Sequence, residues 1–151
     1  KKTGAIIKLS KNSINIKGPQ KIKNIKNIIT KEYEGFPTDL APQFMVLLCK
    51  ANGKSSITEN IFQGRFLHVM ELQRLGARIN IENRTAKIEG KTNFLGAEVM
   101  SSDLRASAAL VLAGIVSKGK TTVSRIYHCD RGYENFENKL KKIGVEIKRL
   151  K

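Results

Sequence analysis

The stretch VMSSDLRASAALVLAG, residues 99–114, opens with a serine–aspartate pair and continues as a nearly all-apolar segment. Residues 37–48, PTDLAPQFMVLL, open in the same way, with TDL at 38–40 where the later stretch has SDL at 102–104. Serine, threonine and aspartate favour helix starts because their side-chain oxygens accept hydrogen bonds from free backbone N–H groups of the first turn. Both stretches therefore predict a helix, and their likeness indicates a repeated unit.

The likeness extends beyond the two predicted helices. Gly53 and Gly119 follow them, each at a place where a left-handed C-terminal cap is expected. Strands rich in β-branched residues and then amphipathic helices come next in both copies; the strands are predicted over 55–59 and 121–127, and the helices over 65–77 and 132–145. Internal repeats of roughly 70 residues thus organise the chain.

Alternating apolar and polar residues predict two hairpins, one over 1–18 and one over 77–90 that turns around Asn83. The first hairpin matches the end of a repeat whose beginning is not included. The sequence therefore predicts the tail of one unit in residues 1–18, a second unit in 19–90 and a third in 91–151. We expect the 151 residues to be the C-terminal part of a longer protein, preceded by the rest of this domain and by a second domain.

The second of the repeated helices leaves almost no polar face between Ala106 and Val116, which is typical of a helix that is buried on every side. The hairpins instead alternate like sheets that have one exposed face. The sequence thus predicts an α/β (α+β) fold built from repeats, with helices inside and sheets outside.

The chain carries a formal charge of +15 at pH 7, and residues 1–31 hold nine lysines and no acidic residue. Such a surface attracts polyanions, so a non-catalytic basic module that binds nucleic acid is one alternative function. Lysine outnumbers arginine 20 to 8, however, and no aromatic residues alternate with the basic run. Base stacking and bidentate phosphate binding are therefore not indicated, and a solvated lysine-rich surface is the simpler interpretation.

No segment approaches the ~18 apolar residues of a membrane-spanning helix, and the N-terminus lacks the apolar region of a signal peptide. Cys49 and Cys129 form no disulfide or metal-ligand pattern, which fits a reducing cytoplasm. His68 and His128 lack a second ligand at metal spacing, and we expect them to pack or to hydrogen-bond. The sequence therefore predicts a cytoplasmic protein with no membrane contact, no metal and no cofactor.

Asp39 and Asp103 stand at the two predicted helix starts. One interpretation is that each of them is an N-cap. Pro42 supports this for Asp39, because a proline in the first turn of a helix loses no hydrogen bond.

Three arginines suggest a second interpretation. Arg65 and Arg131 lie 66 residues apart in equivalent places, and Arg105 follows Asp103 at the second helix start. Because a repeat brings equivalent features to comparable places, these side chains could form a compact cluster with the aspartates. Arginine binds carboxylates and phosphates through paired hydrogen bonds, and an aspartate beside it can orient or deprotonate a hydroxyl.

Four segments carry a resemblance to a known family; they are GFPTDLAPQF, RFLHVMELQRLGARI, GAEVMSSDLRASAALVLAG and RIYHCDRGYE. They closely resemble the UDP-N-acetylglucosamine 1-carboxyvinyltransferases, the enolpyruvyl transferases that open bacterial peptidoglycan synthesis, in register over residues 1–151. The resemblance implies a fold of two domains, each an inside-out α/β barrel of three repeated units. This chain would be the C-terminal portion.

The resemblance also implies a reaction with two small-molecule substrates. The enolpyruvyl group of phosphoenolpyruvate passes to the 3-hydroxyl of UDP-N-acetylglucosamine, and phosphate leaves, by addition and then elimination through a tetrahedral intermediate. Asp39 matches the family position that contacts the attacking hydroxyl, which makes it the candidate general base. Ile61 matches a nucleotide-sugar binding position.

Arg65, Arg105 and Arg131 match family arginines around the reacting phosphoenolpyruvate, where they hold its carboxylate or phosphate and stabilise developing charge. Asp103 matches an acidic residue of the same cluster, and this role leaves an N-cap role intact. The implied catalytic residues are Asp39, Asp103, Arg105 and Arg131, and the implied substrate-binding residues are Asp39, Ile61, Arg65, Arg105 and Arg131.

The chain departs from the family pattern at two points. Gly64 stands before Arg65 where the family has asparagine, so we expect a more mobile loop. The family's reactive cysteine and further substrate contacts lie in the other domain, so we expect the isolated chain to be inactive.

A naturally short chain that needs a partner in trans is an open alternative. The shikimate-pathway enolpyruvyl transferase is another, although FPTDL and RIYHCDRGYE favour the nucleotide-sugar enzyme.

Overall fold

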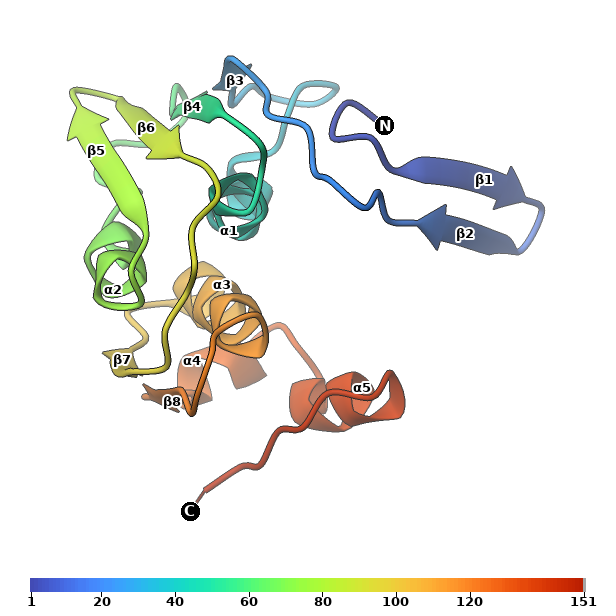
Figure 1. Cartoon of the computed structure of the whole chain (residues 1–151), viewed down its shortest axis with the longest axis vertical. Helices are drawn as coiled ribbons and strands as arrows, with labels where there is room; N and C mark the ends of the chain where they lie inside the picture. Colours follow the sequence, from blue (N-terminus) through green and yellow to red (C-terminus); the bar gives the residue numbers. More distant parts are fainter. Residues whose placement is uncertain (151) are drawn as a thin grey trace.

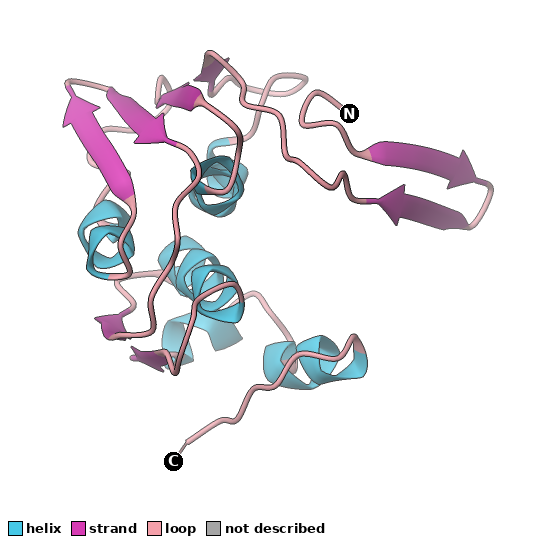
Figure 2. Ribbon diagram, in the orientation of Figure 1, coloured by secondary structure: helices cyan, strands magenta, loops and turns pink. Residues whose placement is uncertain are grey.

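A computed structural model describes residues 1–150; Lys151, the last residue of the predicted third unit, lies outside them. The chain forms three small sheets and several short helices (Figures 1 and 2). The strands are β1 (Ile6–Ser10), β2 (Ser13–Lys17), β3 (Ile28–Ile29), β4 (Lys54–Thr58), β5 (Arg78–Glu82), β6 (Thr85–Glu89), β7 (Glu98–Met100) and β8 (Thr122–Ser124). The helices are the 3₁₀ turn η1 (Thr38–Leu40), α1 (Ala41–Cys49), α2 (His68–Arg74), α3 (Leu104–Ile115), α4 (Tyr127–Asp130) and α5 (Phe136–Lys142).

The largest sheet has four strands in the order β3, β4, β6, β5. β3 runs parallel to β4, whereas β6 is antiparallel to both β4 and β5. β5 and β6 form the hairpin predicted over 77–90, and Asn83 turns it with a φ of 54°. Asparagine is enriched in this left-handed backbone region. The hairpin predicted over 1–18 is also confirmed, because β1 pairs with β2.

Helices α1, α2 and α3 lie between the four-stranded sheet and the parallel β7–β8 pair (Figure 1). α1 and α3 contact each other, and their apolar side chains join those of the strands in one core. Its fully buried members include Met45 and Leu48 of α1, Ile57 of β4, and Ala109 and Leu110 of α3. This is the predicted arrangement, with helices inside and sheets outside.

Helix α3 follows its prediction over most of its length. Seven of its residues, between Ala106 and Ala113, are buried. The end of the helix differs, because Ile115 and Val116 are 38% and 44% exposed, so the prediction of burial on every side is wrong there. Across residues 1–150, no helix is both long and apolar enough to cross a membrane.

One predicted strand is shorter than expected. The strand predicted over 121–127 is present only as β8, and residue 127 already belongs to α4. Arg125 ends the extended backbone because its φ of 54° lies in the left-handed region. In the other copy, β4 nearly matches the prediction over 55–59. The two copies therefore diverge after these strands.

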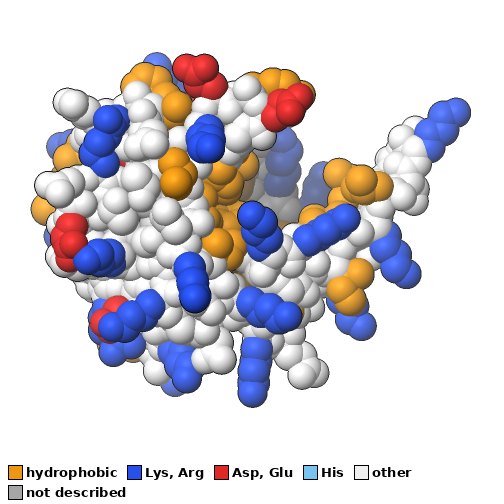
Figure 3. All heavy atoms as spheres, turned by 90° about the horizontal axis from the view of Figure 1, so that it is seen from above, with side chains coloured by type: hydrophobic (Ala, Val, Ile, Leu, Met, Phe, Trp, Pro, Cys, Tyr) orange, Lys and Arg blue, Asp and Glu red, His pale blue; other side chains and the backbone are white. Residues whose placement is uncertain are grey.

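The β1–β2 hairpin projects from the body of the molecule (Figure 1). The pairs Ile7–Ile16 and Leu9–Ile14 place four apolar side chains on one face, because cross-strand partners share a face. Leu9, Ile14 and Ile16 are 73%, 66% and 66% exposed. Hydrophobic side chains are visible along the projecting arm in Figure 3. Nothing within the described residues covers this face.

Candidate active site

Two helix starts lie close together because α1 and α3 pack against each other. Asp39 lies in η1, directly before α1, and Asp103 directly precedes α3. Arg105, in the first turn of α3, reaches the other start, and its Nε donates to Asp39 Oδ1 at 2.5 Å. Arg65 Nη1, from the loop between β4 and α2, lies 3.4 Å from the same oxygen. Asp39, Arg65 and Arg105 thus form an aspartate–arginine cluster.

The members of the aspartate–arginine cluster differ in exposure. The Asp39 side chain is 64% exposed, whereas those of Arg65 and Arg105 are 21% and 31% exposed. The ring of Phe62 supports Arg65 from another side, with its centroid 4.2 Å from the guanidinium carbon, which is a cation–π distance. Two held guanidinium groups beside a solvent-facing carboxylate can bind an anionic group and a hydroxyl together.

The interpretation of Asp39 as an N-cap is wrong. The N-cap of α1 is Leu40, and no side chain among the described residues caps this helix. Asp103 binds the N–H of Ala106, but the corresponding residue of α1 is Pro42, which has no N–H to offer. The proline therefore leaves the Asp39 carboxylate available to the arginines.

The N-cap role predicted for Asp103 is confirmed. Its Oδ1 accepts hydrogen bonds from the N–H groups of Arg105 at 2.9 Å and Ala106 at 3.1 Å, and its Oδ2 accepts one from the Ser102 hydroxyl at 2.9 Å. Burial alone would raise the pKa of Asp103, but these hydrogen bonds and the Arg105 charge outweigh burial and lower that pKa below its ordinary value. Asp103 is therefore a charged cap.

The structure places Arg131 beside the helix starts but outside the ion pairs. Arg131 directly follows α4 and is exposed, and none of the ion pairs found within residues 1–150 involves it. The next residues approach both starts. A Cβ atom on Gly132 would lie 2.9 Å from the Leu104 side chain, and the Tyr133 hydroxyl accepts a hydrogen bond from Gln43 Nε2 at 3.0 Å. The loop is thus close to the two helix starts, although no ion pair within residues 1–150 links Arg131 to the cluster.

A buried carboxylate that the sequence analysis missed lies at the end of β4. Glu59 is 2% exposed. Its Oε1 accepts hydrogen bonds from the Thr30 hydroxyl at 2.9 Å and from the N–H groups of Ile61 and Phe62 at 2.7 and 3.0 Å; its Oε2 accepts one from the Thr38 hydroxyl at 2.7 Å. Burial would raise the pKa of Glu59, but these hydrogen bonds outweigh it and lower that pKa.

The register of β4 contained a signal for Glu59. Residues 55, 57 and 59 alternate onto the buried face, so an acidic side chain at the third position needs polar partners. Ile61, predicted to bind the nucleotide sugar, lies half-buried in the following loop, where its N–H is held by Glu59.

His68, the first residue of α2, is buried near the same loop. It is 3% exposed, and its Nε2 has no hydrogen-bond partner among the described residues. Burial lowers the pKa of His68 to about 4, although the Asp103 charge and a hydrogen bond to the Arg65 backbone act in the opposite direction. The imidazole is therefore neutral at pH 7, and the predicted packing role is confirmed.

The two cysteines are buried, and burial raises the pKa of the Cys49 thiol to about 12 and that of the Cys129 thiol to about 11. Neither is a thiolate nucleophile at neutral pH, and the core position predicted for Cys49 is confirmed. Within residues 1–150, no three His, Cys, Asp or Glu side chains are arranged to hold a metal ion.

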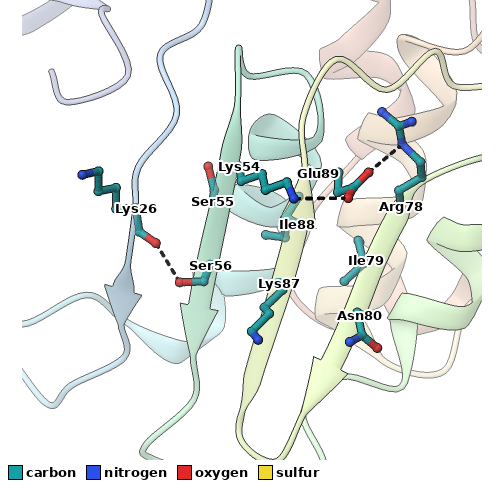
Figure 4. A pocket seen from close by; sticks show the side chains of 10 residues that line it. All are labelled: Lys26, Lys54, Ser55, Ser56, Arg78, Ile79, Asn80, Lys87, Ile88 and Glu89. Carbon is teal, nitrogen blue, oxygen red and sulfur yellow. Dashed lines mark hydrogen bonds and ion pairs between the residues drawn. The ribbon is translucent and has the colours of Figure 1, made fainter.

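Two surface hollows within residues 1–150 do not include the aspartate–arginine cluster. One lies over an end of the four-stranded sheet and is lined by Lys26, Lys54, Lys87, Arg78 and Glu89, among other residues (Figure 4). Lys54 and Arg78 pair with Glu89 at 3.8 and 3.3 Å, which offsets part of the positive charge. The other hollow lies between α3, β8 and the C-terminal segment. We place the candidate active site at the cluster, because charged groups from three separate segments converge there.

Comparison with known proteins identifies the family. The family model of EPSP synthase (3-phosphoshikimate 1-carboxyvinyltransferase) matches residues 1–140. The UDP-N-acetylglucosamine 1-carboxyvinyltransferase of Pelagibacter ubique (strain HTCC1062) is 58% identical over 150 residues, which are 99% of this chain and 36% of that protein. Its namesake from Endomicrobium trichonymphae is 55% identical, over 98% of this chain and 35% of that protein. The chain thus spans about a third of the length of these curated relatives.

Solved structures share the fold. The enolpyruvyl transferase NikO from Streptomyces tendae superposes with a TM-score of 0.89 at 25% identity, over 97% of this chain and 34% of that one. An EPSP synthase from Acinetobacter baumannii superposes with a TM-score of 0.68 over 99% of this chain and 35% of that one; at 17% identity this shows the fold alone. The inside-out α/β fold class predicted for the chain is therefore confirmed. The chain belongs to the EPSP synthase family of enolpyruvyl transferases, and within it is similar in sequence to the UDP-N-acetylglucosamine 1-carboxyvinyltransferases.

Proposed function

We propose that this chain is part of a cytoplasmic enzyme that transfers the enolpyruvyl group of phosphoenolpyruvate to the 3-hydroxyl of UDP-N-acetylglucosamine, the first committed step of peptidoglycan synthesis. The observation that carries the proposal is the aspartate–arginine cluster, in which two guanidinium groups from different segments hold the Asp39 carboxylate in a solvent-facing position. Relatives that are 51% to 58% identical bear the name of this activity.

Asp39 is the proposed general base. Its carboxylate accepts the proton of the attacking 3-hydroxyl while the hydroxyl oxygen bonds to the central carbon of phosphoenolpyruvate. In the same step the methylene carbon takes a proton from a general acid, which is proposed to come from the remainder of the enzyme. Because an aspartate is a weak base, proton removal contributes most when it accompanies this protonation. Loss of a proton from the new methyl group and of phosphate from the neighbouring carbon then restores the double bond.

Arg65 and Arg105 are proposed to bind the carboxylate or phosphate of phosphoenolpyruvate, because the guanidinium fork matches these groups. An aromatic ring holds Arg65 and the first turn of α3 holds Arg105, so both can stabilise developing charge without rearrangement. Arg131 is proposed as a third arginine that turns toward bound substrate from its loop. Asp103 supports Arg105 by capping its helix, and Ile61 is proposed to contact the nucleotide sugar.

The chain is proposed to act with the N-terminal remainder of a longer polypeptide. It spans about a third of its curated relatives, and the apolar face of the β1–β2 hairpin is uncovered within residues 1–150. We propose that this hairpin packs against the remainder, and that the chain alone is inactive. The unit boundaries predicted after residues 18 and 90 are part of the same proposal.

The shikimate-pathway reaction is the second candidate, because the matching family model bears the name EPSP synthase. Sequence identity favours the first candidate. Two solved structures of EPSP synthase from Acinetobacter baumannii are 17% identical to the chain, whereas relatives named for the nucleotide-sugar reaction are 51% to 58% identical.

A chimeric enzyme tests both candidates. The chain replaces the matching segment of the Pelagibacter ubique relative, and phosphate release from phosphoenolpyruvate is measured with UDP-N-acetylglucosamine or shikimate 3-phosphate as the acceptor. We expect turnover with the nucleotide sugar alone. Turnover with shikimate 3-phosphate alone would select the second candidate, and a folded chimera without turnover would contradict the proposal. Turnover by the isolated chain would show that the remainder is not required.

A further inference from the structure

Glu59 connects the two segments that carry the proposed contacts to the nucleotide sugar. Thr38, whose hydroxyl donates to Glu59 Oε2 at 2.7 Å, directly precedes Asp39 in η1. Ile61, whose N–H donates to Glu59 Oε1 at 2.7 Å, lies in the loop after β4. One carboxylate therefore joins the turn of the proposed base to the loop of the proposed nucleotide-sugar contact.

The backbone at Glu59 is itself held on both sides. Its N–H donates to the Arg84 carbonyl at 2.8 Å, and Arg84 Nε donates to its carbonyl at 2.9 Å. Thr30 adds a link, because its hydroxyl donates to Glu59 Oε1 and accepts from the Asn60 N–H, both at 2.9 Å. The Glu59 carboxylate thus projects from an anchored strand end, so it can hold the Asp39 turn and the Ile61 loop in fixed positions.

The chemistry of Glu59 indicates more than packing. Burying a carboxylate costs far more free energy than burying an apolar side chain, and the hydrogen bonds described for it come from two hydroxyls and two amides, which are neutral. Hydrogen bonds to a charged acceptor are roughly twice as strong as neutral ones. A buried carboxylate therefore holds the turn and the loop more tightly than an amide would, which suits the precise support that a reacting group needs.

We propose that Glu59 is a positioning residue that sets the place of the Asp39 turn relative to the Ile61 loop, so that the hydroxyl of a bound nucleotide sugar meets the carboxylate. This inference rests on the function proposed above for Asp39. Glu59 does not contact the substrates in this proposal, and it acts through the hydroxyl of Thr38 and the N–H of Ile61.

Thr38→Val in the chimera tests the proposal, because it removes the hydroxyl bound to Glu59 and keeps the shape of the side chain. The control Thr58→Val removes a hydroxyl that is bonded to Thr85 at 2.9 Å on the neighbouring strand. We expect Thr38→Val to lower kcat by about tenfold or more, with the KM for phosphoenolpyruvate within about twofold, and Thr58→Val to change neither. Thr38→Ser, which keeps the hydroxyl, should restore kcat. Equal kcat values for the two valine variants would overturn the proposal.

Amide hydrogen exchange in the 151-residue chain separates this inference from the proposed function. Thr38→Val should raise the exchange rates of the Ile61 and Phe62 N–H groups by about tenfold, and Thr58→Val should not, whatever reaction the enzyme catalyses. Unchanged exchange in Thr38→Val would overturn the proposal. Raised exchange together with a chimera that shows no turnover would support the link made by Glu59 and count against the proposed reaction.

Discussion

The two helix starts, TDLA at α1 and SDLR at α3, share a sequence pattern and differ in structure. Asp103 caps α3 through two N–H groups, whereas Asp39 faces two arginines instead of its own helix. The difference begins at Pro42. It occupies the position of Ala106 in the other copy, but it has no N–H to donate to the aspartate. A repeated pattern can thus keep the capping role in one copy and leave the same residue free to pair with arginines in the other.

The comparison also shows that the cluster belongs to both copies. Arg105 belongs to the second start, at the place where the first has Ala41, and its side chain binds the carboxylate of the first start. Neither copy alone contains both the proposed base and this arginine.

Asp39→Asn in the chimera should have the largest effect. The amide keeps the shape of the side chain but cannot accept the proton, so we expect kcat to fall by about a hundredfold or more. Folding should survive because Asp39 caps no described helix, which circular dichroism can check. The control Glu82→Gln, at a carboxylate paired with Lys87 on the sheet, should leave kcat unchanged. Full turnover in Asp39→Asn would remove Asp39 as the base.

Acid should lower the stability of the chain, because the buried imidazole of His68 lies near Asp103 at the start of α3 and resists protonation. The pKa of His68 is about 4 in the folded chain against the ordinary 6.5, so between these pH values the unfolded chain binds a proton that the folded chain excludes. The free energy of unfolding therefore falls as the pH falls through this window, by about 1.4 kcal/mol per unit and about 3 kcal/mol by pH 4. Above pH 6.5 this contribution is constant.

Urea unfolding of the chain across this pH window measures the effect of His68. His68→Gln should reduce the loss of stability in acid, and the same substitution at half-buried His128 is the control. An equal acid sensitivity in His68→Gln and the unsubstituted chain would show that another group responds.

Alanine substitutions at Asp39 and Asp103 compare what the two side chains contribute to the free energy of unfolding. Asp103→Ala removes a cap with two N–H partners, so we expect the free energy of unfolding to fall by about 1–2 kcal/mol. Asp39→Ala should lower it by less than about 0.5 kcal/mol, because solvent screens ion pairs to an exposed carboxylate. Urea unfolding at pH 7 measures both. Similar losses would mean that Asp39 also caps its helix in solution.

The smallest effect concerns the loop that carries Arg65. Gly64 has a φ of 72°, and apart from its two chain neighbours no described residue has an atom within 4 Å of the place where its Cβ would be. Asparagine tolerates this left-handed backbone and β-branched residues do not. We expect Gly64→Asn to change the free energy of unfolding by less than about 0.5 kcal/mol, and Gly64→Val to lower it by more than about 1 kcal/mol. A large loss in Gly64→Asn would indicate a different loop conformation.

Features that depend on sequence neighbours were predicted well. The two hairpins and the Asp103 cap follow from alternation and from side chains that bind their own backbone. The N-cap interpretation of Asp39 fails because Pro42 lacks the N–H group that the corresponding residue, Ala106, donates to Asp103. The early end of β8 depends on the left-handed backbone of Arg125. An arginine in the sequence does not predict this conformation.

Features that depend on distant segments were not predictable in the same way. In the sequence, Glu59 is simply the last residue of the strand predicted over 55–59. Only the fold brings the hydroxyls of Thr30 and Thr38 to its carboxylate. The contact of Arg105 with Asp39 required the packing of α1 on α3, which the repeat suggested without a distance. The roles of the site residues remain predictions, because they concern substrates.

The spacing of the cluster along the chain has a consequence for its synthesis. Arg65 and Arg105 follow Asp39 by 26 and 66 residues. At a synthesis rate of about 5–20 residues per second, a ribosome adds Arg105 to the chain roughly 3–13 s after Asp39. The proposed base is therefore made long before the arginine that orients it. A nascent chain that stalls before residue 105 carries the proposed base without Arg105, so the aspartate–arginine cluster can form only after translation has reached the second copy.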